Sequence, residues 1–430
     1  MTPLPREPIL AGRQHRRGQD VDELPIGRRV AYWRRRRRLS QQVFADRLGR
    51  SKSWVDKVER GVRRLDRFPV IDQIADVLGV EVDTLLGQTA RRRVRGAGHP
   101  VGSAEVDGIR TALERCDLIG MLTQPAGPVP DLSELARSVR HAWLTYQSAR
   151  GAVLARALPD LLREAQAADV AHSGGDGQSR SAHLLGQVYQ IASSALRNLG
   201  EYQLAWLAAD RAVSVAQRAG DELLAGVASC RVGMALLALG RARPALEVNL
   251  SVANRLAPAG TGPATPQRLS VYGMLLLQGA MAAARLGDEA TVAELLVAAA
   301  GAADHVGGDH NHYWSCFGPT NVQLHRAAAA VELGDARTAV ATHERVRAAG
   351  LSTLVTERRV HHLLDVARGC ARLGDVQRAA ALLAEGDRMA PTELSTRPFA
   401  REIVADVLRR TRGEPPPALR DLAVSAGVAG

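Results

Sequence analysis

Residues 41–61 read QQVFADRLGRSKSWVDKVERG, and this stretch decides how the N-terminal part of the chain folds. Two short amphipathic segments meet at Gly49, a residue type that makes tight turns at low conformational cost. Small Ala45 lets two helices cross closely, and Val55 places an apolar side chain on the inner face of the second helix. Ser51 stands where its side chain can cap that helix. The stretch therefore predicts two packed helices joined by a tight turn.

The spacing of these residues, followed by Glu-x-Gly ending at Gly61, closely resembles the helix-turn-helix of the lambda-repressor-like (Xre) family. The resemblance implies a five-helix DNA-binding domain over residues 26–87, with its recognition helix in the major groove of an operator in double-stranded DNA. Lysine suits guanine and serine suits several bases, so Lys52 and Ser53 are expected to face base edges. The alternative that Lys52 and Lys57, the only lysines of the chain, contact only phosphates stays open. The residues expected to contact DNA are Arg34, Gln41, Gln42, Arg50, Ser51, Lys52, Ser53, Trp54, Asp56 and Lys57.

The distribution of charge agrees with a DNA-binding segment. The chain has a formal net charge of +11. Residues 26–95 carry 19 Lys and Arg against 8 Asp and Glu, whereas residues 1–25 carry 4 of each and residues 96–430 carry 33 of each. The positive excess is confined to the window of the motif, as expected for a domain that neutralises phosphates. The larger, neutral part of the chain is expected to have a different role.

Arginines and loop-forming residues mark the borders of this window. Five arginines, Arg34–Arg38, close the first predicted helix, and only some of them can face a duplex because successive residues turn about a helix. Residues 1–25 lack periodicity and are predicted to be a disordered arm. Residues 88–107, with Arg91–Arg93 and Arg95 among Gly and Pro, are predicted to be a basic linker. Whether the linker arginines follow the DNA backbone or only keep a loop hydrated stays open.

The composition argues against several other classes of protein. Hydrophobic residues make up 46% of the chain and aromatic residues 3%, which favours an all-α fold of close-packed helices. The four cysteines are far apart, so neither a disulfide framework nor a cysteine metal site is expected, and a cytoplasmic location fits. No stretch has the length and apolarity of a signal peptide or a membrane span. The motifs GxxxxGK[ST], HExxH and GxSxG are absent, so we expect no enzyme, no cofactor and no metal.

A repeated pattern fills residues 108–412. An Ala- and Leu-rich helix ends in Leu-Gly five times, at intervals of 40 or 47 residues, and a charged turn and a second helix follow each time. Two examples of that second helix are Tyr202–Ala219 and Val376–Met389. The five steps are Leu199-Gly200, Leu239-Gly240, Leu286-Gly287, Leu333-Gly334 and Leu373-Gly374.

This pattern resembles tetratricopeptide (TPR) repeats, although its period is longer than the usual ~34 residues. The resemblance implies an α-solenoid of TPR-like helix pairs that serves as a sensor and dimerisation domain. Residues 131–170 are expected to form the first pair and residues 393–412 a closing helix. Residues 413–430, which begin with three prolines after a short polar stretch, are expected to be a loose C-terminal tail.

Residues 305–326 read HVGGDHNHYWSCFGPTNVQLHR and form the most unusual segment of the repeats. The Gly-Pro-Thr-Asn within it is similar to stretches in actinobacterial regulators of this type. Asn321 and His325 stand four residues apart and should share a helix face, where an Asn can bond a peptide backbone with both its donor and its acceptor. The alternative that the aromatics pack in the core and Asn321 caps a helix stays open. The residues expected to bind an effector are Asn198, Arg231, Tyr313, Trp314, Phe317, Asn321 and His325.

The order of the domains resembles that of Gram-positive regulators in which an Xre-type reader is joined to such repeats and controlled by a signalling peptide, as in quorum sensing. The resemblance implies a transcription regulator whose repeats bind a peptide or a small-molecule effector. A homodimer is expected, since two-fold operators suit two-fold proteins. An alternative is an interaction scaffold, in which the repeats bind a protein partner while the DNA-binding domain holds the complex on DNA.

Overall fold

The chain consists of two structural units, Met1–His99 and Pro100–Gly430. Within the residues that the computed structural model describes, every regular element is a helix, apart from one isolated bridge between His310 and Phe317. The prediction of an all-α fold is thus confirmed. The described residues are 26–63, 65, 68–78, 80, 85, 103–114, 130–258, 264–349, 351–391 and 393–428. The predicted arm and most of the predicted linker lie outside them.

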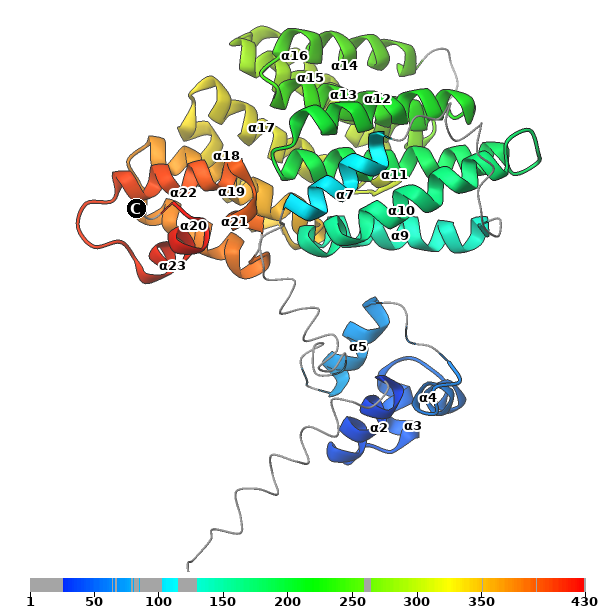
Figure 1. Cartoon of the computed structure of the whole chain (residues 1–430). Helices are drawn as coiled ribbons and strands as arrows, with labels where there is room; N and C mark the ends of the chain where they lie inside the picture. Colours follow the sequence, from blue (N-terminus) through cyan, green and yellow to red (C-terminus); the bar gives the residue numbers. More distant parts are fainter. Residues whose placement is uncertain are drawn as a thin grey trace, which may run out of the picture. The chain divides into compact units, whose positions relative to one another are not determined.

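The first unit is a small helical domain (Figure 1). Its described helices are α2 (Ile26–Arg36), α3 (Gln41–Arg47), α4 (Lys52–Glu59) and α5 (Phe68–Leu78). Each helix contributes to one apolar core, with Val30 from α2, Phe44 from α3, Val55 from α4 and Ile74 from α5 all 0% exposed. The predicted fifth helix falls mostly outside the described residues, although Leu85 there is helical and buried in the same core.

The second unit is a succession of helix pairs, in which each helix packs on the next one along the chain (Figure 1). It begins with α7 (Ser103–Glu114) and the pair α9 (Leu132–Gln147) and α10 (Gly151–Ala171). The next three pairs are α11 (Gln178–Asn198) with α12 (Tyr202–Arg218), α13 (Glu222–Ala238) with α14 (Ala242–Leu256), and α15 (Pro266–Leu286) with α16 (Glu289–Val306). The remaining helices are α17 (Pro319–Leu333), α18 (Ala336–Ala349), α19 (Thr356–Arg372), α20 (Val376–Met389), α21 (Glu393–Thr396), α22 (Pro398–Arg410) and α23 (Pro417–Ser425). The predicted solenoid of helix pairs is therefore present.

The five Leu-Gly steps end the first helix of each pair, as the sequence predicts. All five glycines have φ between 75° and 90°, the left-handed conformation that glycine adopts without steric cost. The second helices predicted at Tyr202–Ala219 and Val376–Met389 are α12 and α20.

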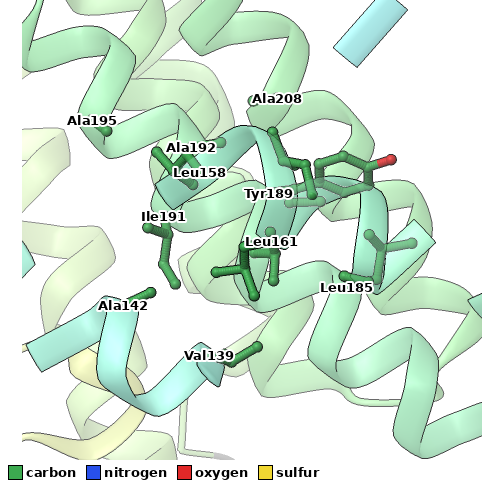
Figure 2. Packing of buried hydrophobic residues seen from close by; sticks show 14 of the residues in the cluster. Val139, Ala142, Leu158, Leu161, Leu185, Tyr189, Ile191, Ala192, Ala195 and Ala208 are labelled. Carbon is green, nitrogen blue, oxygen red and sulfur yellow. The ribbon is translucent and has the colours of Figure 1, made fainter. Parts of the chain in front are cut away.

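Small and branched apolar side chains hold neighbouring pairs together. In the first part of the array, Val139 of α9 and Leu158 of α10 pack with Tyr189 and Ile191 of α11 and with Ala208 of α12 (Figure 2). Alanines at the contacts let the helices approach closely, so that the sparse aromatic content suffices. Although no segment of this kind was expected from the sequence, α15 is, among the described residues, long and apolar enough to cross a membrane; 78% of its apolar window is buried. It packs against α13, α14, α16 and α17, so it is a core helix of this unit.

Three predicted borders need correction. The last residues of the predicted linker are helical, because α7 begins at Ser103 and buries Ile109 against the first pair. The predicted loose tail contains α23, which starts at Pro417 because proline fits the first turn of a helix, and which buries Leu419 in the core. The predicted closing helix is broken in two before Pro398, which lacks the backbone donor needed to continue a helix.

Candidate DNA-reading and effector sites

The helix-turn-helix predicted from the sequence is formed by α3 and α4. Gly49 makes the turn with a φ of 61°, and the Ser51 side chain accepts a hydrogen bond from the backbone N–H of Trp54 at 3.2 Å. Val55 and Val58 of α4 are 0% and 1% exposed in the core. The turn, the cap and the buried face of α4 are therefore those that the sequence predicts.

The opposite face of α4 is open to solvent. Lys52, Ser53 and Lys57 are exposed, so two ammonium groups and one hydroxyl are available on the early turns of the helix. Asp56 is half-buried and pairs with the exposed Arg60 at 2.5 Å, so this carboxylate orients a neighbouring cation. Such a face offers donors to base edges and phosphates alike.

Trp54 lies at the edge of this face between two arginines. The guanidinium of Arg50 is 5.7 Å from the centroid of the Trp54 ring, and that of Arg63 is 6.0 Å away. Stacking on an aromatic ring leaves guanidinium N–H groups free to donate at its rim. The predicted contact residues Arg50 and Trp54 thus form one cationic and aromatic group beside α4.

Arg34 is the one predicted DNA contact that the structure contradicts. Its side chain is buried, and it donates to Glu59 through Nε (2.5 Å) and Nη2 (3.0 Å) and to the carbonyl of Leu39 through Nη1 (2.6 Å). All three guanidinium nitrogens are therefore committed inside the domain. Gln41 joins the same pair by donating to Glu59 at 2.8 Å, whereas Gln42 is exposed and donates to Asp46 at 2.8 Å.

Gly27 is a residue whose role the sequence does not reveal. A Cβ atom at this position would lie 2.1 Å from the carbonyl oxygen of Val58, so only glycine lets α2 approach the end of α4. This close approach holds α4 against α2, the first described helix of the unit.

In the second unit, the first helix pair folds back onto later repeats. The Tyr146 hydroxyl of α9 donates to Glu357 of α19 at 3.4 Å, and Gln147 exchanges two amide hydrogen bonds with Asn311 at 3.1 and 2.9 Å. Asn311 belongs to the segment that the sequence singled out, so α9, α19 and this segment enclose a common interior. The contact between Tyr146 and Glu357 is buried, whereas Asn311 is exposed.

Two predicted effector contacts, Phe317 and His325, belong to the interior packing instead. The Phe317 side chain is 0% exposed and fills the space at Gly273 of α15, where a Cβ atom would lie 2.0 Å from the ring. His325 is buried with its Nε2 3.1 Å from the Gln278 amide and its Nδ1 2.9 Å from the carbonyl of Asn321. Burial, reinforced by the charge of Arg358, lowers the pKa of His325 to about 3, so this imidazole is neutral. Both side chains therefore pack and form contacts in the interior, and their predicted contact with an effector stays a prediction.

Tyr313 and Trp314 lie where a ligand can reach them. Both side chains are half-buried, and the Tyr313 hydroxyl is 3.3 Å from both carboxylate oxygens of Asp221. The Trp314 ring stacks on Trp143 with centroids 5.6 Å apart, and its indole nitrogen donates to Gln187 at 3.1 Å. Trp314 also lines a cavity of about 450 Å³, together with Ala136, Val139, Arg140, Arg180, His183, Leu184 and Gln187.

Three further predicted effector residues come from three different helices. Arg231 of α13 and Asn321 of α17 are buried, and Asn198 is half-buried at the end of α11. The Asn321 amide oxygen accepts a hydrogen bond from Arg358 of α19 at 3.1 Å. Arg358 was not anticipated, because its sequence surroundings are those of an ordinary amphipathic helix.

A comparison with known protein families agrees with the helix-turn-helix observed in the first unit. A family model described as a helix-turn-helix domain matches residues 25–86. Neither the curated proteins nor the solved structures include one that matches this chain. The chain therefore carries a helix-turn-helix DNA-binding domain, followed by an array of helix pairs.

Proposed function

We propose that this chain is a cytoplasmic transcription regulator that reads an operator with α4 and has no catalytic role. The observation that carries the proposal is the geometry of α4, whose buried face and Ser51 cap fix it in the domain while Lys52, Ser53 and Lys57 stay exposed. A helix presented in this way fits the major groove, where lysine and serine side chains discriminate between bases. The positive charge of residues 26–95 supplies the phosphate contacts that support affinity.

The test is the double substitution of Lys52→Ala with Ser53→Ala, after genome-wide mapping of bound DNA has identified an operator. We expect the variant to lose discrimination between the operator and an unrelated duplex in gel-shift titrations, while its helical circular dichroism is unchanged. Arg243→Ala, an exposed position of the second unit, serves as the control and should bind as the unmodified protein does. An unchanged preference for the operator in the double variant would show that α4 is not the recognition helix.

The second unit is proposed to bind a signalling peptide or a small-molecule effector that changes operator affinity. The cavity of about 450 Å³, which is lined by residues of α9 and α11 and by the half-buried Trp314, supports this proposal. An effector that binds one state of the protein more tightly must raise its thermal stability and shift its operator affinity by the same coupling. In the alternative, a TPR-like scaffold docks a protein partner, and neither quantity responds to peptides or small molecules.

We further propose that the regulator acts as a homodimer. A DNA-binding domain of about 60 residues covers few base pairs, and two copies related by a two-fold axis match a palindromic operator. Light scattering at working concentration, with and without DNA, measures the stoichiometry. A monomer under both conditions contradicts the dimer but leaves DNA reading by α4 intact.

A further inference from the structure

Three arginines from three different helices of the second unit are withdrawn from solvent, Arg231 fully and Arg197 and Arg358 by about half. They are Arg197 near the end of α11, Arg231 in the middle of α13 and Arg358 in the first turn of α19. Each of these helices is the first of its pair. Within the described residues, none of the three forms an ion pair with a carboxylate.

The three guanidinium groups act on one common point, the thiol of Cys230. Burial raises the pKa of this thiol to about 11, and Arg231, Arg197 and Arg358 each act in the opposite direction. Arg358 and Arg231 likewise act on the thiol of Cys316. The contacts agree: Arg231 lies on the ring of Trp143, whose neighbour Tyr146 donates to Glu357, the residue before Arg358, so Arg231 and Arg358 both lie near the same part of α9.

The acidic side chains nearby compensate these positive charges only in part. Glu357 is buried and pairs with Arg397 at 3.3 Å, and Arg397 also pairs with the buried Glu393. Glu393 in turn accepts a hydrogen bond from the backbone N–H of Gly151 at 3.2 Å. Two carboxylates thus face four arginines, because the charges of Arg358 and Arg197 also act on Glu357, and Arg231 is left without a carboxylate partner among the described residues.

Arg231 is held in place without a polar partner for its charge. Its side chain is 7% exposed, its guanidinium lies 5.7 Å from the ring centroid of Trp143, and Nη1 is 3.4 Å from the sulfur of Met234. Its buried Nε has no hydrogen-bond partner among the described residues. A buried cation with such contacts lowers the stability of a fold unless an anion compensates it.

Asn321 and Arg358 present further unused donors to the same interior. Asn321 is 0% exposed, and its Nδ2 has no hydrogen-bond partner among the described residues while its Oδ1 is taken by Arg358. The buried Nε of Arg358 also lacks a partner in the described part of the chain. The arrangement therefore contains N–H donors and positive charge with no acceptor to match them.

We propose that Arg231 and Arg358, assisted by Arg197 and Asn321, bind an oxyanion of the effector, either a carboxylate or a phosphate group. Guanidinium groups suit both because their forked N–H groups pair with two oxygens at once. This inference rests on the proposed effector-binding function of the second unit and specifies the ligand as an anion. A carboxylate can come from a small acid or from the C-terminus of a peptide, and a phosphate from a phosphorylated metabolite.

The segment beside this site is suited to respond to the anion. The backbone φ angles of Tyr313, Trp314 and Cys316 are 50°, 60° and 51°, values that residues other than glycine rarely adopt. Trp314 stacks on Trp143, the ring that also contacts Arg231. An anion that moves Arg231 therefore changes the packing that holds the strained segment in place.

The experiment uses the full chain and four probes: inorganic phosphate, citrate, N-acetyl-trialanine with a free C-terminus, and the same peptide amidated. Thermal unfolding and tryptophan fluorescence are followed as each probe is raised to millimolar concentrations, against chloride of equal ionic strength. We expect at least one of the three anionic probes, but not the amidated peptide, to raise the unfolding temperature. Phosphate, citrate and peptide report separately on a phosphate, a small acid and a peptide carboxylate as the source of the oxyanion.

Arg231→Gln and Arg358→Gln should weaken the response at least about tenfold, the effect of losing a charge-assisted hydrogen bond. Arg231→Lys keeps the charge and should retain part of the response, and the exposed Arg243→Gln should retain all of it. Arg231→Gln should melt at or above the unmodified protein without a probe, because it removes an uncompensated charge. An unmodified protein that responds to none of the anions, or a glutamine variant that responds as the unmodified protein does, overturns the site.

Operator binding measured with the same proteins separates this inference from the proposed function. If an anion binds at Arg231 and leaves operator affinity unchanged, the anion site stands and the effector role fails. If no anion binds while an uncharged peptide or small molecule changes operator affinity, the effector role stands and the anion site fails.

Discussion

Glu59→Leu is expected to unfold the DNA-binding unit selectively. Glu59 is the only carboxylate that Arg34 contacts among the described residues, and the side chains of the two are 6% and 8% exposed. After the substitution, Arg34 keeps only its hydrogen bond to the carbonyl of Leu39. Its charge then remains buried without a counterion, which is the costly way to break such a pair.

The size of the effect follows from the size of the unit. Leaving one member of a buried ion pair uncompensated costs about 3–5 kcal/mol. A domain of about 60 residues has a free energy of unfolding of about 3–9 kcal/mol at the usual value per residue. The variant should therefore bring the first unit close to, or past, the midpoint of unfolding, while the second unit keeps its stability.

Hydrogen exchange of the full chain, read by mass spectrometry, measures this effect in place. Since about 1.4 kcal/mol corresponds to a factor of ten, the buried amides of α4 should exchange about two to four orders of magnitude faster. Asp56→Asn is the matched control on the same helix, because its ion pair with Arg60 is largely exposed and contributes about 0–1 kcal/mol. The double variant Arg34→Met with Glu59→Leu removes both charges and should recover most of the protection.

The reasoning fails if Glu59→Leu and Asp56→Asn exchange alike in α4. It also fails if the double variant is as unprotected as Glu59→Leu, because the loss would then come from shape and not from charge.

Three further predictions concern single side chains. Ser51→Ala should lower the stability of the first unit by about 1 kcal/mol through loss of the α4 cap, seen as faster exchange of the first turn of that helix. Phe317→Ala should cost about 3–5 kcal/mol in urea unfolding of the second unit, whereas a role in ligand contact alone would leave that stability unchanged. Although burial alone would raise the pKa of Glu357, Arg397 and Arg358 hold it at about 2, so its contribution is present above about pH 4.5 and lost as the pH falls towards 2. Between pH 4.5 and pH 2, the unfolding temperature of Glu357→Gln should therefore fall less steeply than that of the unmodified protein. If the two proteins lost stability in parallel over this interval, the role assigned to the Glu357 carboxylate would be wrong.

The features that the sequence predicts correctly are those that depend on a few neighbouring residues. Ser51 caps α4 and Gly49 makes the turn because both effects act within one helical turn of the residue. The Leu-Gly steps end helices for the same reason, since a left-handed residue is a local requirement. The helix pairs and the DNA-binding domain can therefore be predicted from such local signals, without knowledge of which distant residues are in contact.

The features that the sequence does not predict depend on distant partners. Arg34 stands in a run of five arginines, and only Glu59, 25 residues later, determines that this one is buried. Phe317 follows a polar segment, yet Gly273 on another helix pair makes the space that its ring fills. Arg358 looks like a surface residue until the fold brings it to Asn321, so sequence pattern alone could not include it in the site.

The charge balance of the second unit conceals a local imbalance with a functional consequence. Residues 96–430 carry equal numbers of basic and acidic residues, and many exposed arginines there pair with a carboxylate on their own or a neighbouring helix. The acids are thus used at the surface and in the Arg397 cluster, where Arg358 and Arg197 also act on Glu357, while the buried Arg231 has no carboxylate partner among the described residues. A fold selected only for stability has no reason to bury such charges, because an apolar interior of the same shape is at least as stable. If the proposed anion site is correct, the second unit reaches its most stable state only when an anion is bound, which is the property that the proposed sensor needs in order to control the DNA-binding domain.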